Sequence, residues 1–176
     1  MVENVCNLNW LPINRENKLS IFSFDYKGFR FYGCVIILKD NNLYVNFPSR
    51  EDDRFKNYYY IPDADKKKVF TDFVLDKYRE QESAGKAEEN DFEITNVHIK
   101  HLAGENRVAI ASFKLDDIFI VKELTILNIK DRLVVVYPEV YVGNRGKRQG
   151  VMHPLSERVR LKVEEEVLAE YKAQRP

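Results

Sequence analysis

The sequence has few cysteines and no long apolar segment. The two cysteines, Cys6 and Cys34, lack a CxxC spacing and lie inside apolar runs, where a thiol usually behaves as a small buried hydrophobe. This excludes a disulfide-rich scaffold, and no secretory signal is recognisable. The apolar runs reach only strand length, well short of the ~20 residues of a membrane helix. We expect a cytoplasmic protein with no membrane contact.

The chain also lacks an excess of charge of either sign. Its 28 Lys and Arg residues balance 28 Asp and Glu residues, so a nucleic-acid site would have to be a local basic patch. No Ser-His-Asp, Cys-His or paired-carboxylate arrangement occurs, and no glycine-rich phosphate loop connects a strand to a helix. The sequence therefore gives no support for an enzyme or for a cofactor.

The three histidines do not indicate a metal site. His98 and His101 are three residues apart in a predicted strand and should lie on opposite faces, a poor geometry for one ion. His153 precedes a proline at a predicted helix entrance, where an imidazole can bond to backbone groups. We expect it to be structural, and we interpret Asp116-Asp117 as a hairpin turn instead of an acid pair.

An internal repeat is the main feature of the chain. Residues 16–24 recur as residues 105–113, at an offset of 89, and at that offset 29–38 faces 118–127. After one inserted residue, 43–48 matches 133–138. Each copy then has a polar loop, an X-Pro step and a closing helix, and a match in this order predicts a tandem repeat.

The repeat predicts an α+β fold of two tandem units. Each unit should be an antiparallel β-sheet of about four to five strands followed by a C-terminal helix. We place the first unit at 1–80, a polar linker at 81–91 and the second unit at 92–176. A unit of about 80 residues buries a modest core, so we expect the two to pack as an intramolecular pseudo-dimer with approximate two-fold symmetry. Nearly unbroken apolar runs predict strands buried on both faces.

Both closing helices show N-caps and apolar stripes. Asp63 can cap the first and Ser156 the second. The stripes comprise Val69, Phe70, Phe73, Val74 and Tyr78 in the first helix, and Val159, Leu161, Val163, Val167, Leu168 and Tyr171 in the second.

Aromatic residues could stack bases in a single-strand binder. Tyr58-Tyr59-Tyr60 is the obvious candidate. Adjacent strand residues point to opposite faces, so at least one ring should be buried, and we favour structural packing. Trp10 should be partly buried in the first strand.

Several segments of the second unit resemble the SpoVG family, the stage V sporulation protein G septation regulators. They are 94–97, 107–117, 119–121, 153–156 and 165–171. The first unit resembles the family more loosely and keeps the Pro-Ser-Arg step at 48–50, where the second has Pro-Glu-Val at 138–140. Conversely, the first has Ile61-Pro62 where the family shows His-Pro. The resemblance implies a small α+β fold, dimerisation, and binding of DNA and RNA in gene regulation without a cofactor.

A basic segment at 143–150 is the strongest candidate for nucleic-acid contact. It contains three cations among three glycines between a strand and a helix, so it can approach phosphates closely. Two helix cations at i,i+4 would extend it. The alternative is a solvated hairpin beside an ordinary charged helix face, which also carries Glu165. The corresponding first-unit loop, 50–54, is acidic at its centre and should contribute little. The six candidate residues are Arg50, Arg145, Lys147, Arg148, Arg158 and Lys162.

Two functions remain open at this point. The first is a regulator that binds DNA or RNA through the basic segment and the second helix. The alternative is a protein–protein interaction or scaffold module in septation control that has lost nucleic-acid binding, which would suit the zero net charge.

Overall fold

The computed structural model describes residues 1–49, 56–80, 91–142 and 147–174. The first half contains the 3-10 helix η1 (Val2–Asn4), strands β1 (Val5–Arg15), β2 (Lys18–Tyr26), β3 (Phe29–Lys39), β4 (Asn42–Asn46) and β5 (Tyr59–Tyr60), and helix α1 (Ala64–Glu80). The second half contains β6 (Ile94–His101), β7 (Arg107–Leu115), β8 (Phe119–Ile129), β9 (Arg132–Val136), β10 (Glu139–Val142), β11 (Lys147–Gly150), β12 (Met152–Pro154) and helix α2 (Glu157–Ala173).

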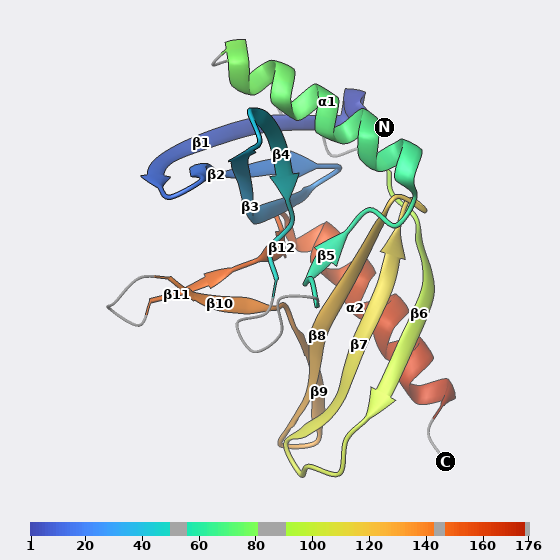
Figure 1. Cartoon of the computed structure of the whole chain (residues 1–176). Helices are drawn as coiled ribbons and strands as arrows, with labels where there is room; N and C mark the ends of the chain where they lie inside the picture. The colour runs from blue at the N-terminus through green and yellow to red at the C-terminus, as the bar shows by residue number, and fades with distance from the viewer. Residues whose placement is uncertain (50–55, 81–90, 143–146, 175–176) are drawn as a thin grey trace.

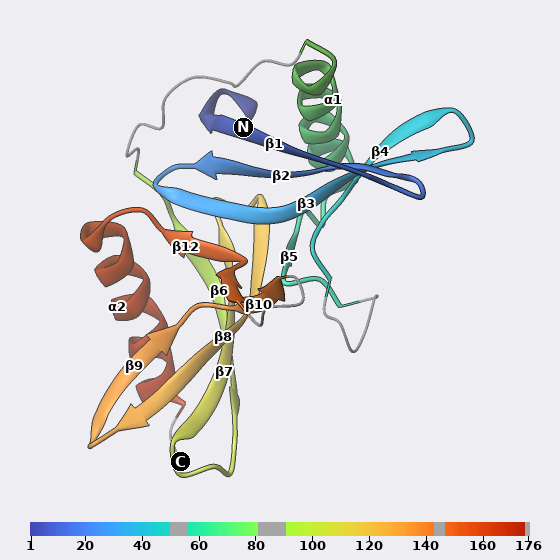
Figure 2. The same cartoon turned by 90° about the vertical axis from the view of Figure 1, so that its left-hand side faces the viewer.

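These elements form two five-stranded antiparallel sheets, each with its own helix (Figure 1). The N-terminal sheet comprises β1, β2, β3, β4 and β12, and the C-terminal sheet comprises β5, β6, β7, β8 and β9. Figures 1 and 2 show α1 against the N-terminal sheet and α2 against one face of the C-terminal sheet. The predicted α+β fold of two sheet-and-helix units is confirmed.

Each sheet is completed by a strand from the other half of the chain. Strand β12 pairs with β3, and β5 pairs with β8. The flanking hydrogen bonds repeat as well: the Tyr32 amide donates to the Val151 carbonyl at 2.8 Å, and the Lys122 amide donates to the Tyr58 carbonyl at 2.7 Å. The two halves are therefore joined as an intramolecular pair, but through a strand exchange that the sequence did not predict.

The elements of the two halves correspond one to one, with two changes from the expected alignment. Strands β2 and β7 begin 89 residues apart, but β3 and β8 begin 90 apart, as do β4 and β9. The inserted residue therefore lies in the turn at 116–118, which is one residue longer than the turn at 27–28. The expected place of the insertion, after the third strand, is not where it occurs. The helices begin 93 residues apart, so Tyr60-Ile61, and not Ile61-Pro62, occupies the place of His153-Pro154.

Irregularities in the strands also repeat. Asn7 in β1 and Asn96 in β6 both have a positive φ, of 47° and 50°, at the same bulge. Gly33 in β3 and Glu123 in β8 form the next equivalent pair, with φ of 86° and 64°. Such bulges bend and twist both sheets in the same way.

The core is shared between the two halves. The Phe119 ring lies 5.1 Å from that of Tyr26, 5.2 Å from Phe31, 5.9 Å from Phe24 and 6.0 Å from Phe70, measured between ring centroids. All four neighbours belong to the first half, so burial of Phe119 depends on packing of one unit on the other. Nearby, the Lys27 ammonium lies 3.0 Å from an Asp116 carboxylate oxygen, which joins the two equivalent turns.

Both predicted helix caps are confirmed. The Lys66 amide donates to the Asp63 carboxylate at 2.8 Å, and the Val159 amide donates to the Ser156 hydroxyl at 3.3 Å. The apolar stripes are narrower than predicted, because Val69 and Leu161 are each 51% exposed. Within the described ranges no helix has the length and apolar character needed to cross a membrane.

The prediction that strands are buried on both faces is wrong for β7 and β8 of the C-terminal sheet. Burial along β7 and β8 alternates, with fully buried side chains on the helix side and partly exposed ones on the other. Outward apolar residues such as Ile110, Ile120 and Leu127 explain the unbroken apolar runs. Strands β7 and β8 therefore bury one face and leave the other partly open, whereas residues 22–26 of β2 in the N-terminal sheet are buried on both faces.

The predicted burial of the tyrosine run and of Trp10 agrees with the structure. Tyr59 is fully buried while Tyr58 and Tyr60 are partly exposed, which confirms that at least one ring of the tyrosine run is buried. Trp10 lies in β1, partly buried, against Phe22 and Tyr78. The domain boundaries stay a prediction, since residues 81–90 of the linker lie outside the described part of the chain.

Candidate nucleic-acid interface

Residues 147–150 of the basic segment form strand β11, which pairs with β10, and residues 143–146 lie outside the described part of the chain. Strands β10 and β11 pair from Glu139 opposite Gly150 to Val142 opposite Lys147. The base is closed by the Val151 amide, which donates to the Pro138 carbonyl at 2.8 Å. Figure 1 shows the paired strands β10 and β11 extending away from both sheets.

The six predicted binding residues are described to different extents. Arg50 and Arg145 lie outside the described residues. Lys147 and Arg148 lie in β11, opposite Val142 and Tyr141 respectively. Of the six, Arg158 and Lys162 are the residues whose side-chain contacts the structure describes.

Both helix cations contact the segment that leads into β6. An Arg158 guanidinium nitrogen lies 2.8 Å from a carboxylate oxygen of Asp91, and both side chains are exposed. The Lys162 ammonium donates to the Phe92 carbonyl and lies 4.3 Å from the centroid of the Phe92 ring. Lys162 therefore ties α2 to the start of β6, whereas the exposed Arg158 pair contributes little stability and can exchange its partner.

The first half has a shorter counterpart of the hairpin. An isolated bridge joins Ser49 to Asn57, and the offsets of 90 and 93 residues place it where Glu139 pairs with Gly150. The intervening 50–55 lies outside the described residues, so the expectation that this acidic loop contributes little stays a prediction.

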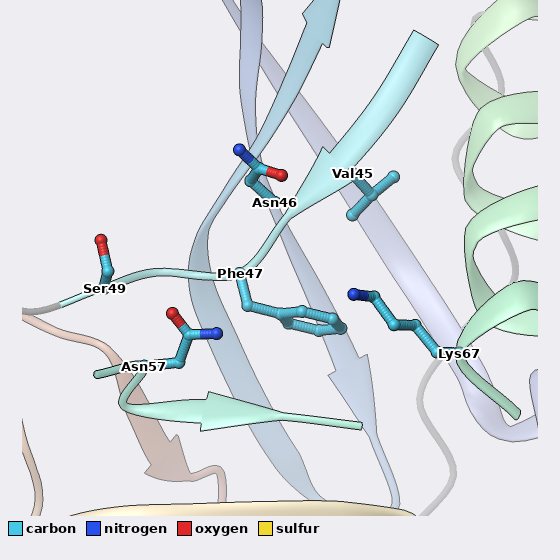
Figure 3. A pocket seen from close by; sticks show the side chains of 6 residues that line it. All are labelled: Val45, Asn46, Phe47, Ser49, Asn57 and Lys67. Atoms are coloured by element: carbon cyan, nitrogen blue, oxygen red, sulfur yellow. The ribbon is translucent and has the colours of Figure 1, made fainter. Parts of the chain in front are cut away.

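A small open hollow of about 240 Å³ adjoins this bridge (Figure 3). Its lining residues are Val45, Asn46, Phe47, Ser49, Asn57 and Lys67. Two amides, a hydroxyl and an ammonium around an aromatic ring could hold a small polar or anionic group. The volume is below the ~300 Å³ at which ligand pockets usually begin. At the equivalent of Lys67, Arg160 pairs with Glu157 and Glu164 at 3.1 and 3.2 Å.

A buried polar cluster, which the sequence did not reveal, lies on the side of the N-terminal sheet away from α1. The Asp25 side chain is fully buried, and its carboxylate accepts two hydrogen bonds from Arg30, at 2.6 and 2.8 Å. The Asn7 amide donates a third at 2.8 Å. The two-residue turn at 27–28 places Asp25 directly opposite Arg30 on the neighbouring strand. The spacing of these two residues around the turn is the sequence feature from which the pair could have been predicted.

His153 adjoins this cluster. It pairs in register with Arg30, and its ring stacks on Tyr32 with centroids 5.5 Å apart. Partial burial, followed by the charge of Arg30, lowers the pKa of His153 below its usual 6.5. The predicted structural role fits this placement, although its contacts are to strand β3 and not to loose backbone at the helix entrance.

The other histidines do not come together. The His101 ring packs against Tyr171 of α2, with ring centroids 5.3 Å apart. Ile99 is buried on the same face of β6, and His98 points to the opposite face. Among the described residues no group of three or more His, Cys, Asp or Glu side chains could hold a metal ion.

Comparison with known proteins concerns the second half of the chain. A family model described as SpoVG matches residues 92–173. A protein of Oceanobacillus iheyensis with the name "Putative septation protein SpoVG" is 34% identical over 80 residues, covering 45% of this chain and 82% of the relative. Proteins of the same description from Geobacillus thermodenitrificans and Listeria monocytogenes are each 32% identical, with 82% and 78% of their lengths covered. The chain therefore belongs to the SpoVG family.

Proposed function

We propose that this chain is a cytoplasmic regulatory protein of the SpoVG type that binds DNA or RNA, and that it is not an enzyme. Phosphates would be contacted by the end of the β10–β11 hairpin, with Arg158 at the start of α2 as an additional contact. The observation that carries the proposal is the projecting pair of strands β10 and β11, because β11 contains Lys147 and Arg148 and the sequence 143–150 holds three cations and three glycines.

The physical basis is electrostatic. Cations on a narrow projection can approach a phosphate backbone without a large complementary surface, and glycines permit close backbone approach. Three or four contacts neutralise few phosphates, so binding should be weak to moderate and should weaken as salt rises. Lys162 would support the site by positioning α2, because its ammonium is bound to Phe92.

The pseudo-dimer would be asymmetric in this function. We infer a tandem duplication from the repeated order, register and bulges of the two halves. Among the described residues, the second half has paired strands next to a basic segment, and the first half has a bridge between Ser49 and Asn57 at the corresponding place. One chain would thus present one hairpin to nucleic acid.

A protein-binding scaffold in septation control is the second candidate. Exposed apolar side chains favour it: Leu11 is 63% and Tyr44 44% exposed on the N-terminal sheet, on the face away from α1. The relatives are named as septation proteins, which fits either mode of action.

Fluorescence anisotropy with labelled single-stranded RNA and duplex DNA tests the proposal. The hairpin variant carries Arg145→Gln, Lys147→Gln and Arg148→Gln. The control variant removes three exposed cations elsewhere, through Lys39→Gln, Lys68→Gln and Arg79→Gln. We expect salt-sensitive binding that the control keeps and the hairpin variant loses at physiological salt. Absence of wild-type binding at low salt, or equal loss in both variants, would overturn the proposal.

A further inference from the structure

The face of the C-terminal sheet away from α2 combines cations, an aromatic ring and apolar side chains. Figures 1 and 2 show α2 on one side of this sheet, and within the described ranges no helix or strand covers the other side. We call this surface the open face. The residues that define it are Tyr60, Lys100, Arg107, Ile110, Lys114 and Lys122.

Strand register brings these residues together in rows. Lys114 pairs with Ile120, which pairs with Tyr60. Lys122 follows two residues along β8, and its ammonium lies 4.7 Å from the centroid of the Tyr60 ring. A neighbouring row carries Lys100 opposite Ile110. Because adjacent strands are about 4.8 Å apart, the cations and the ring lie within reach of one extended polymer.

The fold itself does not require these cations. The same positions of the N-terminal sheet, at offsets of 89 or 90 residues, hold Asp25 for Lys114, Tyr32 for Lys122 and Leu11 for Lys100. Only Arg107 has a cationic counterpart, Lys18. Three of the four cations are therefore a property of one sheet and not of the shared architecture.

Acidic neighbours only partly offset this charge. Lys114 lies 2.8 Å from a carboxylate oxygen of Asp117, an exposed side chain in the adjoining turn, and Glu123 is the bulged residue next to Lys122. Exposed ion pairs of this kind are weak and are readily exchanged for phosphate. Four cations against two acids leave the open face complementary to a polyanion.

We propose that the open face binds single-stranded nucleic acid. Bases would stack on Tyr60 and lie over Ile110 and Ile120, while phosphates contact Lys100, Lys114, Lys122 and Arg107. A single strand exposes base faces to a sheet, whereas a duplex keeps them stacked internally. The inference rests on the proposed nucleic-acid function, but it names a different surface from the hairpin and a single-stranded ligand.

Two variants test the two kinds of contact. The charge variant is Lys100→Gln with Lys122→Gln, and the stacking variant is Tyr60→Leu. Lys18→Gln with Lys39→Gln removes two exposed cations from the N-terminal sheet as a matched control. Circular dichroism and urea unfolding would verify that each variant is folded before binding is measured.

The expected results differ for each variant. In anisotropy titrations with single-stranded RNA and DNA of about 20 nucleotides, the charge variant should bind about tenfold more weakly, and its logarithmic salt slope should fall by about 1.4, since each phosphate contact contributes about 0.7. Tyr60→Leu should weaken binding at least about fivefold with an unchanged slope. Duplex affinity and the control should stay within about twofold of wild type.

The outcomes separate this inference from the hairpin proposal. Weaker single-strand binding in the open-face variants would support binding at the open face, whether or not the hairpin variant also lost affinity. Single-strand affinities within about twofold of wild type in both open-face variants, together with a loss in the hairpin variant, would overturn the inference and keep the proposed function. A wild-type protein that binds neither polymer at low salt would overturn both.

Discussion

The Tyr59 hydroxyl donates a hydrogen bond to the backbone carbonyl of Tyr32 at 2.9 Å, across the junction of the two sheets. The Tyr59 backbone pairs with Val121 of the C-terminal sheet, while its ring packs 4.8 Å from Phe31 of the N-terminal sheet. The Cys34 thiol lies 3.3 Å from the same hydroxyl. One buried side chain therefore connects both halves of the core.

Tyr59→Phe should lower the free energy of unfolding by about 1–2 kcal/mol, because it leaves a buried carbonyl without this donor. The ring and its packing remain, so the change isolates the hydrogen bond. Urea unfolding checks the value, and Tyr44→Phe, at an exposed position, serves as the control with a change below about 0.5 kcal/mol. An equal effect of both substitutions would contradict a specific role for the Tyr59 hydroxyl.

Arg30→Ala should lower the free energy of unfolding more than Tyr59→Phe does. It would leave the fully buried Asp25 carboxylate with Asn7 as its remaining side-chain donor, and removal of one partner from a buried ion pair costs about 3 kcal/mol. Arg79→Ala is the matched control, because the Arg79–Asp76 pair is exposed and should contribute less than about 0.5 kcal/mol. Chemical unfolding of both variants gives the comparison, and similar losses would show that Asp25 does not depend on Arg30.

Local pattern was sufficient to predict the repeat and both helix starts. The caps at Asp63 and Ser156 were visible because N-cap chemistry is local. The strand exchange could not be predicted, since β5 has two residues and β12 three, and their partners lie at least 60 residues away. Pairing over such a distance leaves no periodicity in either segment.

Sequence alone also could not show which cations of the candidate site are available to a ligand. Spacing placed Arg158 and Lys162 on one face of α2, but whether an ammonium is available to a ligand depends on tertiary contacts. Lys162 is bound to Phe92, 70 residues away. The open face was hidden for a related reason: apolar residues such as Ile110 and Ile120 gave runs that favoured complete burial, although their side chains point outward.

His153 should make stability pH-dependent. Its pKa is lower in the folded protein than the usual 6.5, through burial and the charge of Arg30, so the unfolded chain binds a proton more readily. The stabilising contribution is complete above about pH 6.5 and is lost as pH falls through the lowered folded pKa. His153→Gln should therefore lose less stability than wild type between neutral pH and about pH 5, as measured by urea unfolding at each pH. Parallel pH profiles would contradict this assignment.

Residues 92–176 expressed alone should not fold as a monomer. Without the first half, Phe119 loses the rings of Phe24, Tyr26, Phe31 and Phe70, and β8 loses its pairing with β5. A homodimer could restore the strand pairing, because β12 occupies the place of β5 in the repeat and could pair with β8 of a second copy. Light scattering with circular dichroism should show a folded dimer or an unfolded chain, whereas the full chain needs no such partner. A folded monomer of 92–176 would show that the two units do not complete each other's core.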